Sequence, residues 1–145
     1  MNIGLDMMGG DFAPLETVKG AAEFLTTATA DIHLTLIGDE AQVKAHLINH
    51  PIPAEKFTIV NAAQVITMNE HPTKALKEKP GSSIAKGFQL LATGKRNAFI
   101  SAGNTGAMMV GSLFSIKAIE GVLRPTIGAY MPREDDTLGL LVDAG

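Results

Sequence analysis

Residues 98–107 read Ala98-Phe99-Ile100-Ser101-Ala102-Gly103-Asn104-Thr105-Gly106-Ala107, and they join an apolar strand pattern to an apolar helix pattern. We expect a strand over residues 98–101, a tight turn over 102–104 and a helix over 105–119. That helix is apolar on nearly all sides, which predicts a central position in the protein. A strand that turns directly into a helix is the building unit of α/β folds.

The same alternation continues on both sides of this stretch. Further strands are predicted at residues 3–6, 32–37, 57–60, 127–131 and 138–142. Helices are predicted to begin at Pro14, after Asp39 and after the N-cap Ser82. The second of these should bury Val43, Leu47 and Ile48. Residues 61–81 are less regular, with a short strand predicted at Val65-Ile66. The pattern predicts a largely parallel sheet with helices on both faces.

The final residues also bear on domain organisation. Residues 138–142 have the pattern of a buried strand, and Asp143-Ala144-Gly145 follow it. In an α/β fold such a turn normally leads into another helix. We therefore expect residues 1–145 to form a single α/β domain that is the N-terminal portion of a longer, truncated chain.

Composition excludes several classes of function. The 145 residues carry a formal net charge of −3, which argues against a nucleic-acid-binding protein. Cysteine is absent, so disulfides, thiolate nucleophiles and cysteine-ligated metals are excluded. Residues 97–116 lack charge but contain polar side chains and a glycine turn, so they indicate a buried strand and helix. With no predicted leader or membrane span, the expected location is cytoplasmic.

The turn at residues 101–106 is a candidate anion site. Ligands of open α/β sheets bind at the carboxyl ends of the strands. Free backbone N–H groups and the helix dipole at Thr105 would attract phosphate, and Gly103 and Gly106 would allow close approach. Asn104 and Thr105 can donate hydrogen bonds. The alternative is a capping turn whose glycines only permit tight packing.

A second candidate loop is Asp6-Met7-Met8-Gly9-Gly10-Asp11. It matches neither a dinucleotide-binding glycine motif nor a P-loop. Asp6 and Asp11 could hold a metal, accept a proton from hydrogenphosphate or orient a cation. The alternative is that Asp11 caps the first helix and Asp6 simply ends a strand.

Three further features are weaker. In Lys79-Pro80-Gly81-Ser82-Ser83, a lysine before a helix N-terminus could bind an anion, although an ordinary N-cap with a solvated lysine explains it equally. Arg124 could present its guanidinium to an anion. The third loop at a strand end, residues 143–145, combines glycine with an acid. His71 has no partner at metal-ligand spacing, so no metal site is predicted.

Together these motifs resemble the N-terminal part of the PlsX-type phosphate acyltransferases of phospholipid synthesis. The resemblance runs along the whole chain and preserves the order and spacing of the motifs. It rests on residues 5–14, Gly81-Ser82-Ser83, residues 101–107, Arg124-Pro125 and residues 140–145.

The resemblance implies a fold, a reaction and partners. The fold would be a three-layer α/β/α sandwich similar to phosphotransacetylases and isopropylmalate-dehydrogenase-like proteins. The reaction would convert acyl-[acyl carrier protein] and inorganic phosphate to acyl phosphate and free carrier protein, without a cofactor. The product would feed a glycerol-3-phosphate acyltransferase. A homodimer with peripheral contact at the inner face of the membrane is also implied, the membrane segment lying beyond this chain.

These implications give each candidate residue a role. Gly103, Asn104, Thr105 and Gly106 would bind phosphate, with Asn104 also counted as catalytic. Asp6 and Asp11 would position the phosphate hydroxyl or the loop opposite. Ser82 and Ser83 would add hydrogen bonds to phosphate or to the oxyanion.

Two other functions stay open on the sequence. One is a dehydrogenase or a sugar-phosphate enzyme that uses the same helix N-terminus. The other is a non-catalytic module that docks acyl carrier protein or organises membrane enzymes. Lys74, Lys77 and Lys79 form a short basic run that suits an acidic carrier, although a solvated helix face explains them equally.

Overall fold

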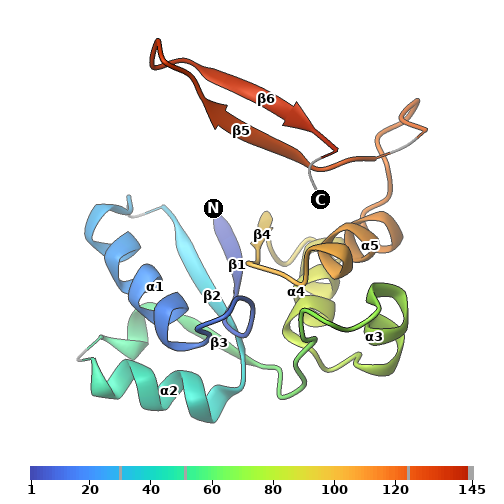
Figure 1. Ribbon diagram of the computed structural model, residues 1–145. Coiled ribbons are helices and arrows are strands. Elements are labelled where there is room, and N and C mark those ends of the chain that lie inside the picture. The colour runs from blue at the N-terminus through green and yellow to red at the C-terminus, as the bar shows by residue number, and fades with distance from the viewer. Residues whose placement is uncertain (30, 51, 124, 144–145) are drawn as a thin grey trace.

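A computed structural model describes residues 1–29, 31–50, 52–123 and 125–143 (Figure 1). Its main sheet has four parallel strands in the order β3-β2-β1-β4. The central strand β1 pairs with β2 on one side, where Leu5 lies opposite Leu36, and with β4 on the other, where Leu5 lies opposite Ile100. The strands are β1 (Asn2–Asp6), β2 (His33–Gly38), β3 (Thr58–Asn61) and β4 (Ala98–Ile100).

Helices cover both faces of this sheet (Figure 1). Helices α1 and α2 pack on one face of the sheet, and α4 packs on the other face. Helix α5 packs against α4, and α3 packs against α5. This is the predicted three-layer α/β/α arrangement. The helices are α1 (Leu15–Thr27), α2 (Glu40–Asn49), α3 (Pro72–Glu78), α4 (Ser83–Ala92) and α5 (Thr105–Ser115), with a short 3₁₀ helix η1 (Ala54–Lys56) before β3.

Side-chain caps fix where helices α2 and α4 begin. Asp39 accepts a hydrogen bond from Gln42 N (3.1 Å) at the start of α2. Ser82 accepts one from Ala85 N (3.3 Å) at the start of α4, as the sequence predicted. Each cap satisfies a backbone N–H that has no partner within its own helix.

Two apolar clusters hold the layers together. The first lies between the sheet and helices α1 and α2. The second joins α3, α4 and α5. The first is built from Ile3, Met7, Val18, Ala21, Leu34, Leu36, Val43, Leu47 and Phe57, and the second from Ile66, Ala75, Ile84, Phe88 and Ala107.

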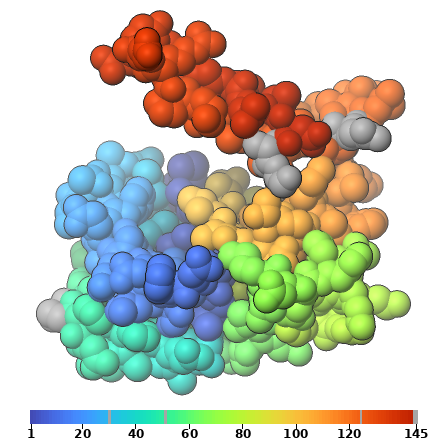
Figure 2. Space-filling model, in the orientation of Figure 1, coloured from blue at the N-terminus to red at the C-terminus, as the bar shows by residue number. Residues whose placement is uncertain are grey.

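The last two strands do not extend the parallel sheet. Strands β5 (Gly128–Pro132) and β6 (Leu138–Val142) form a separate antiparallel hairpin, which stands clear of the body of the molecule (Figure 2). The prediction of a buried core strand at residues 138–142 is therefore wrong in this structure, where Leu140 is 65% exposed. An apolar run indicates a strand that favours burial, but it does not specify which element covers it.

Four local predictions also need correction. Helix α5 ends at Ser115 and not at residue 119, because Lys117 takes a left-handed backbone (φ 64°) that stops a helix. The helix is not central, since Phe114 on its outer side is exposed. Ile48 points to solvent, and Val65-Ile66 contributes no strand beyond an isolated bridge between Gln64 and Ser82.

Neighbouring residues of α2 provide a test of this packing. Leu47 is fully buried, whereas Ile48 is 76% exposed. We expect Leu47→Ala to lower the free energy of unfolding by about 2–5 kcal/mol, because it leaves a cavity in the first cluster. The control Ile48→Ala should change it by less than about 0.5 kcal/mol. Urea unfolding followed by circular dichroism measures both, and similar losses in the two variants would contradict the observed helix orientation.

Candidate functional site

The loops that follow β1 and β4 meet at the carboxyl edge of the sheet. Their contact is a hydrogen bond of 2.7 Å from Ser101 Oγ to Asp6 Oδ2. The other carboxylate oxygen of Asp6 accepts from Met8 N (2.9 Å). Asp6 is buried, and a buried carboxylate is tolerated only when its oxygens are hydrogen-bonded. Asp6 therefore fixes the position of Ser101, and with it the start of the predicted phosphate turn.

Glycine is required where the two loops touch. A Cβ atom on Gly9 would lie 2.7 Å from the carbonyl oxygen of Gly103, which is a backbone atom that cannot move aside easily. Gly103 itself has a φ of 112°, which side-chain-bearing residues rarely adopt. Its N–H donates to Ser101 Oγ (3.1 Å). These close approaches support the packing interpretation of the glycines, and they leave the turn rigid.

Asn104 lies at the N-terminus of α5 with its side chain directed into the protein. Its Oδ1 accepts from Ala107 N (3.0 Å), which caps the helix. Its Nδ2 is within hydrogen-bond distance of three carbonyl oxygens, those of Thr67 (3.0 Å), Met68 (3.2 Å) and Glu70 (3.2 Å). The amide is thus fully engaged. It holds residues 67–70 against the turn, and this geometry points to positioning and not to direct phosphate contact.

Thr105 and Gly106 are the predicted residues that remain available to a ligand. Thr105 is exposed and Gly106 is half-buried. They are the first residues of an eleven-residue helix, where backbone N–H groups lack intrahelical partners and the helix dipole attracts anions. Together with the hydroxyl of Thr105, these N–H groups can surround an anionic oxygen.

An ion pair holds the loop that Asn104 contacts. Glu70 Oε1 accepts hydrogen bonds from Lys79 Nζ (2.7 Å) and from the N–H (2.7 Å) and hydroxyl (3.0 Å) of Thr67. The hydrogen bond from Lys79, followed by that from the Thr67 N–H, lowers the pKa of Glu70 to about 2. Lys79 also donates to Val65 O (2.7 Å). This lysine therefore has a structural role, and the interpretation of Lys79 as a solvated or anion-binding lysine is wrong.

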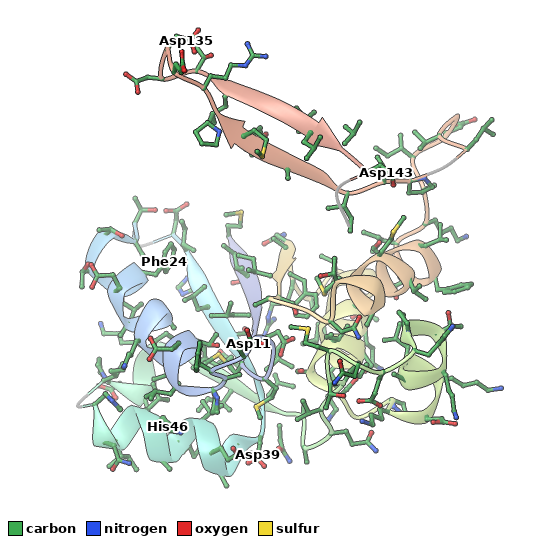
Figure 3. The ribbon with its side chains drawn as sticks, viewed as in Figure 1. Asp11, Phe24, Asp39, His46, Asp135 and Asp143 are labelled. Atoms are coloured by element: carbon green, nitrogen blue, oxygen red, sulfur yellow. The ribbon has the colours of Figure 1, made fainter. Side chains whose placement is uncertain are left out.

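The remaining predicted residues are spread around this edge. Ser82 caps α4, and Ser83 is buried in the first turn of the same helix. Asp11 is exposed on the loop before α1 (Figure 3). Its interpretation as the cap of that helix is wrong, because α1 follows Pro14 and has no side-chain cap.

The third predicted loop does not join the site. Asp143 directly follows β6 of the separate hairpin (Figure 3), and its Oδ1 accepts from Thr126 Oγ1 (3.2 Å). The carboxyl end of an antiparallel strand does not fall at the edge of the parallel sheet, so the expectation that residues 143–145 lie beside the other two loops is wrong for Asp143. Arg124, Ala144 and Gly145 lie outside the described residues.

Sequence reasoning missed the residues that hold the site together. Ser101 belongs to the quoted turn, but nothing in the pattern indicates its bond to Asp6. The Thr67, Glu70 and Lys79 network lies in the irregular region, where an acid and a lysine nine residues apart carry no recognisable motif. Within the described part of the chain, no group of three or more His, Asp or Glu side chains gathers as metal ligands would.

With this geometry established, the chain can be compared with known proteins. The model of a family described as "Fatty acid synthesis protein" matches residues 1–145. The chain belongs to this family. This agrees with the expectation from the loop motifs at residues 5–14 and 101–107.

Several curated relatives of the chain are named phosphate acyltransferase. The chain is 42% identical over 145 residues to a phosphate acyltransferase of Dictyoglomus turgidum, and 40% identical to one of Bacillus pumilus. A phosphate acyltransferase of Neisseria meningitidis is 39% identical over the same length. Each match covers 100% of the chain but only 41–43% of the relative. The chain thus spans about two fifths of the length of these relatives.

A solved structure supports the fold. The EutD phosphotransacetylase from Staphylococcus aureus superimposes with a TM-score of 0.66 over 99% of this chain and 46% of that protein. The sequences are 21% identical, so the likeness concerns the fold alone. It confirms the predicted phosphotransacetylase-like architecture. Among the described helices, none combines the length and apolar character needed to cross a membrane.

The Glu70 ion pair predicts a specific pH dependence of stability. The pKa of Glu70 falls from 4.5 to about 2 on folding, so its charge stabilises the folded protein fully above pH 4.5 and no longer near pH 2. We expect Glu70→Gln to lower the melting temperature by several degrees at pH 7, with the difference from the parent chain shrinking between these two pH values.

Thermal unfolding at pH 7, 4, 3 and 2 measures the effect. Glu78→Gln is the matched control, because Glu78 makes only a 4.0 Å pair with Lys74 on the exposed face of α3. A constant difference between parent and Glu70→Gln at every pH would show that the ion pair does not stabilise the loop.

Proposed function

We propose that this chain forms the phosphate-binding part of an enzyme that transfers an acyl group from acyl-[acyl carrier protein] to inorganic phosphate. The observation that carries the proposal is the family match over residues 1–145, together with relatives named phosphate acyltransferase. The rigid turn at residues 101–106 supplies the chemistry that such a reaction requires at its phosphate end.

The reaction needs no protein nucleophile. An oxygen of hydrogenphosphate attacks the thioester carbonyl, and the C–O bond forms as the carbonyl becomes a tetrahedral oxyanion. The oxyanion then collapses, the C–S bond breaks, and the thiolate leaves. The proton of hydrogenphosphate ends on the thiol, whose ordinary pKa is about 8.5. Acyl phosphate and free carrier protein are the products, so atoms and charges balance.

The protein accelerates this step by positioning and electrostatics. Phosphate held by the N–H groups of Thr105 and Gly106 lies at the positive end of the α5 dipole. Fixing it in attack geometry next to a bound thioester removes several kcal/mol of the barrier. Donors that are already rigid stabilise the oxyanion without reorganising. The hydroxyl of Thr105, at the exposed start of α5, adds a side-chain donor to them, whereas the hydroxyl of Ser101 already donates to Asp6.

The other predicted residues take supporting roles in this proposal. Asn104 is a positioning residue, since its amide is fully engaged by the protein. Asp11 is the exposed carboxylate that could receive or orient the phosphate proton. Ser82 and Ser83 support the same edge from the N-terminus of α4. A homodimer, peripheral membrane contact and delivery of acyl phosphate to a glycerol-3-phosphate acyltransferase complete the proposal.

The proposed reaction can be tested with a chimera. Residues 1–145 would replace the matching part of the Bacillus pumilus relative, to which they are 40% identical. We expect the chimera to release free thiol from palmitoyl-[acyl carrier protein] only when phosphate is present, with the intact relative as positive control. A folded chimera that binds the carrier protein without releasing thiol would overturn the proposal and favour a docking module.

Substitutions at Asn104 separate its two contacts. Asn104→Asp retains the cap on α5 but loses the donors to residues 67–70, and Asn104→Ala loses both. In the chimera we expect Asn104→Ala to lower kcat/KM for phosphate at least about 10-fold, chiefly through KM, with Asn104→Asp in between. The control Asn69→Ala removes an exposed side chain of the same loop. A change below about 3-fold in Asn104→Ala would remove Asn104 from the site.

A further inference from the structure

A cleft of about 540 Å³ begins at the phosphate turn and continues along α5. Its volume is in the range of small-molecule binding sites. The polar end is formed by residues of the turn, including Ser101, Gly103 and Thr105. The rest is mainly apolar, and its walls come from Phe88, Leu91, Phe99, Met108, Met109, Ile116 and Ile127.

The cleft follows one face of α5. Four residues of the helix and one just after its end line the cleft, at positions that fall on one side of the helix: Thr105, Met108, Met109, Ser112 and Ile116. At a rise of about 1.5 Å per residue, the stretch from the first to the last extends about 16 Å. That length suits an extended alkyl chain of medium to long size, with its reactive end at the turn.

Glycines allow the aromatic wall of the cleft. Phe88 and Phe99 pack edge to face, with ring centroids 5.3 Å apart. A Cβ atom on Gly87 would lie 2.2 Å from the ring of Phe99, and one on Gly111 would lie 2.4 Å from Phe88. The two rings occupy the space that these side chains would fill. The glycines of α4 and α5 therefore place an aromatic surface beside the phosphate turn.

We propose that this cleft binds the acyl chain of the thioester substrate, with the thioester carbonyl at the end formed by Ser101 and Thr105. This inference rests on the function proposed above, and it identifies the cleft as the acyl subsite of the same site. An anion-binding turn continuous with an apolar channel matches a substrate pair of phosphate and long-chain acyl group. Each methylene buried there strengthens binding about 4-fold.

The charge of the cleft supports this occupant. Among the residues that the structure describes, those that line it include no Asp, Glu, Lys or Arg. A sugar phosphate or nucleotide would leave its hydroxyl or base edges without partners on the Phe88, Phe99 and Met108 surface, and unpaired buried polar groups are costly. An alkyl chain requires no such partners.

Two residues of α5 provide a matched test. Met109 lines the cleft and is 37% exposed, whereas Leu113 is 43% exposed and is not among the lining residues. Met109→Trp fills the channel, and Leu113→Trp adds the same ring outside it. In the chimera we expect Met109→Trp to lower the ratio of kcat/KM for palmitoyl- to butyryl-[acyl carrier protein] at least about 10-fold, while Leu113→Trp changes it less than about 3-fold.

Direct binding to the 145-residue chain separates this inference from the reaction. Isothermal titration with dodecyl phosphate and butyl phosphate should show that the longer ligand binds more tightly. Met109→Trp should remove that advantage, and Leu113→Trp should retain it. If the chimera is active and Met109→Trp leaves its palmitoyl-to-butyryl ratio of kcat/KM unchanged, the acyl subsite is overturned while the proposed reaction is retained.

The remaining outcomes are equally decisive. An inactive, folded chimera with Met109-dependent binding of dodecyl phosphate would support the alkyl site and overturn the proposed reaction. Equal binding of dodecyl and butyl phosphate would overturn the alkyl site, and would indicate that another part of the protein, such as the β5–β6 hairpin, covers the cleft.

Discussion

The arrangement of the site depends on the buried carboxylate of Asp6. It ends the central strand of the sheet, and burial of its charge requires hydrogen-bond donors. One donor, Met8 N, is local, and the other is the hydroxyl of Ser101, 95 residues further along the chain. This bond joins the loops of two adjacent parallel strands. It also explains why Gly9 carries no side chain, since the loops then lie too close for a Cβ atom.

A second network supports the turn from the other side. Asn104 connects the N-terminus of α5 to residues 67–70, and the ion pair between Glu70 and Lys79 ties that loop to the end of α3. The turn is thus held between Asp6 on one side and Glu70 on the other. The N–H groups of Thr105 and Gly106 therefore belong to a turn that is held in place from both sides. Preorganised donors of this kind stabilise developing charge without a reorganisation cost.

Local patterns in the sequence predicted most strands and helices of the parallel sheet and its layers, but few of the hydrogen bonds that join distant parts of the chain. Alternation of apolar runs and caps such as Ser82 located strands and helices, because these signals depend on near neighbours. The bond between Asp6 and Ser101 depends on which strands are adjacent, and that is a property of topology. Leu140 illustrates the same limit. Its apolar run predicted burial, but the run does not specify which element would cover it, and Leu140 is exposed in the structure. The burial predicted for Ile48 was wrong because Ile48 is one position beyond the buried Leu47, and one position along a helix turns a side chain by about 100°, here to the solvent face.

Helix α5 carries both the anion end and the alkyl channel of the proposed site. The sequence predicted a central helix, because apolar residues surround it almost completely. In the structure one side packs on α3 and α4, and another side lines the open cleft. Core packing therefore accounts for only part of its apolar surface. In the proposed function the first turn of α5 binds an anion and its flank accepts an alkyl chain, which requires polar groups at the N-terminus of the helix and apolar groups along its length. The composition of α5 fits that proposed division, with Thr105 at the polar end and Met108 and Met109 along the channel.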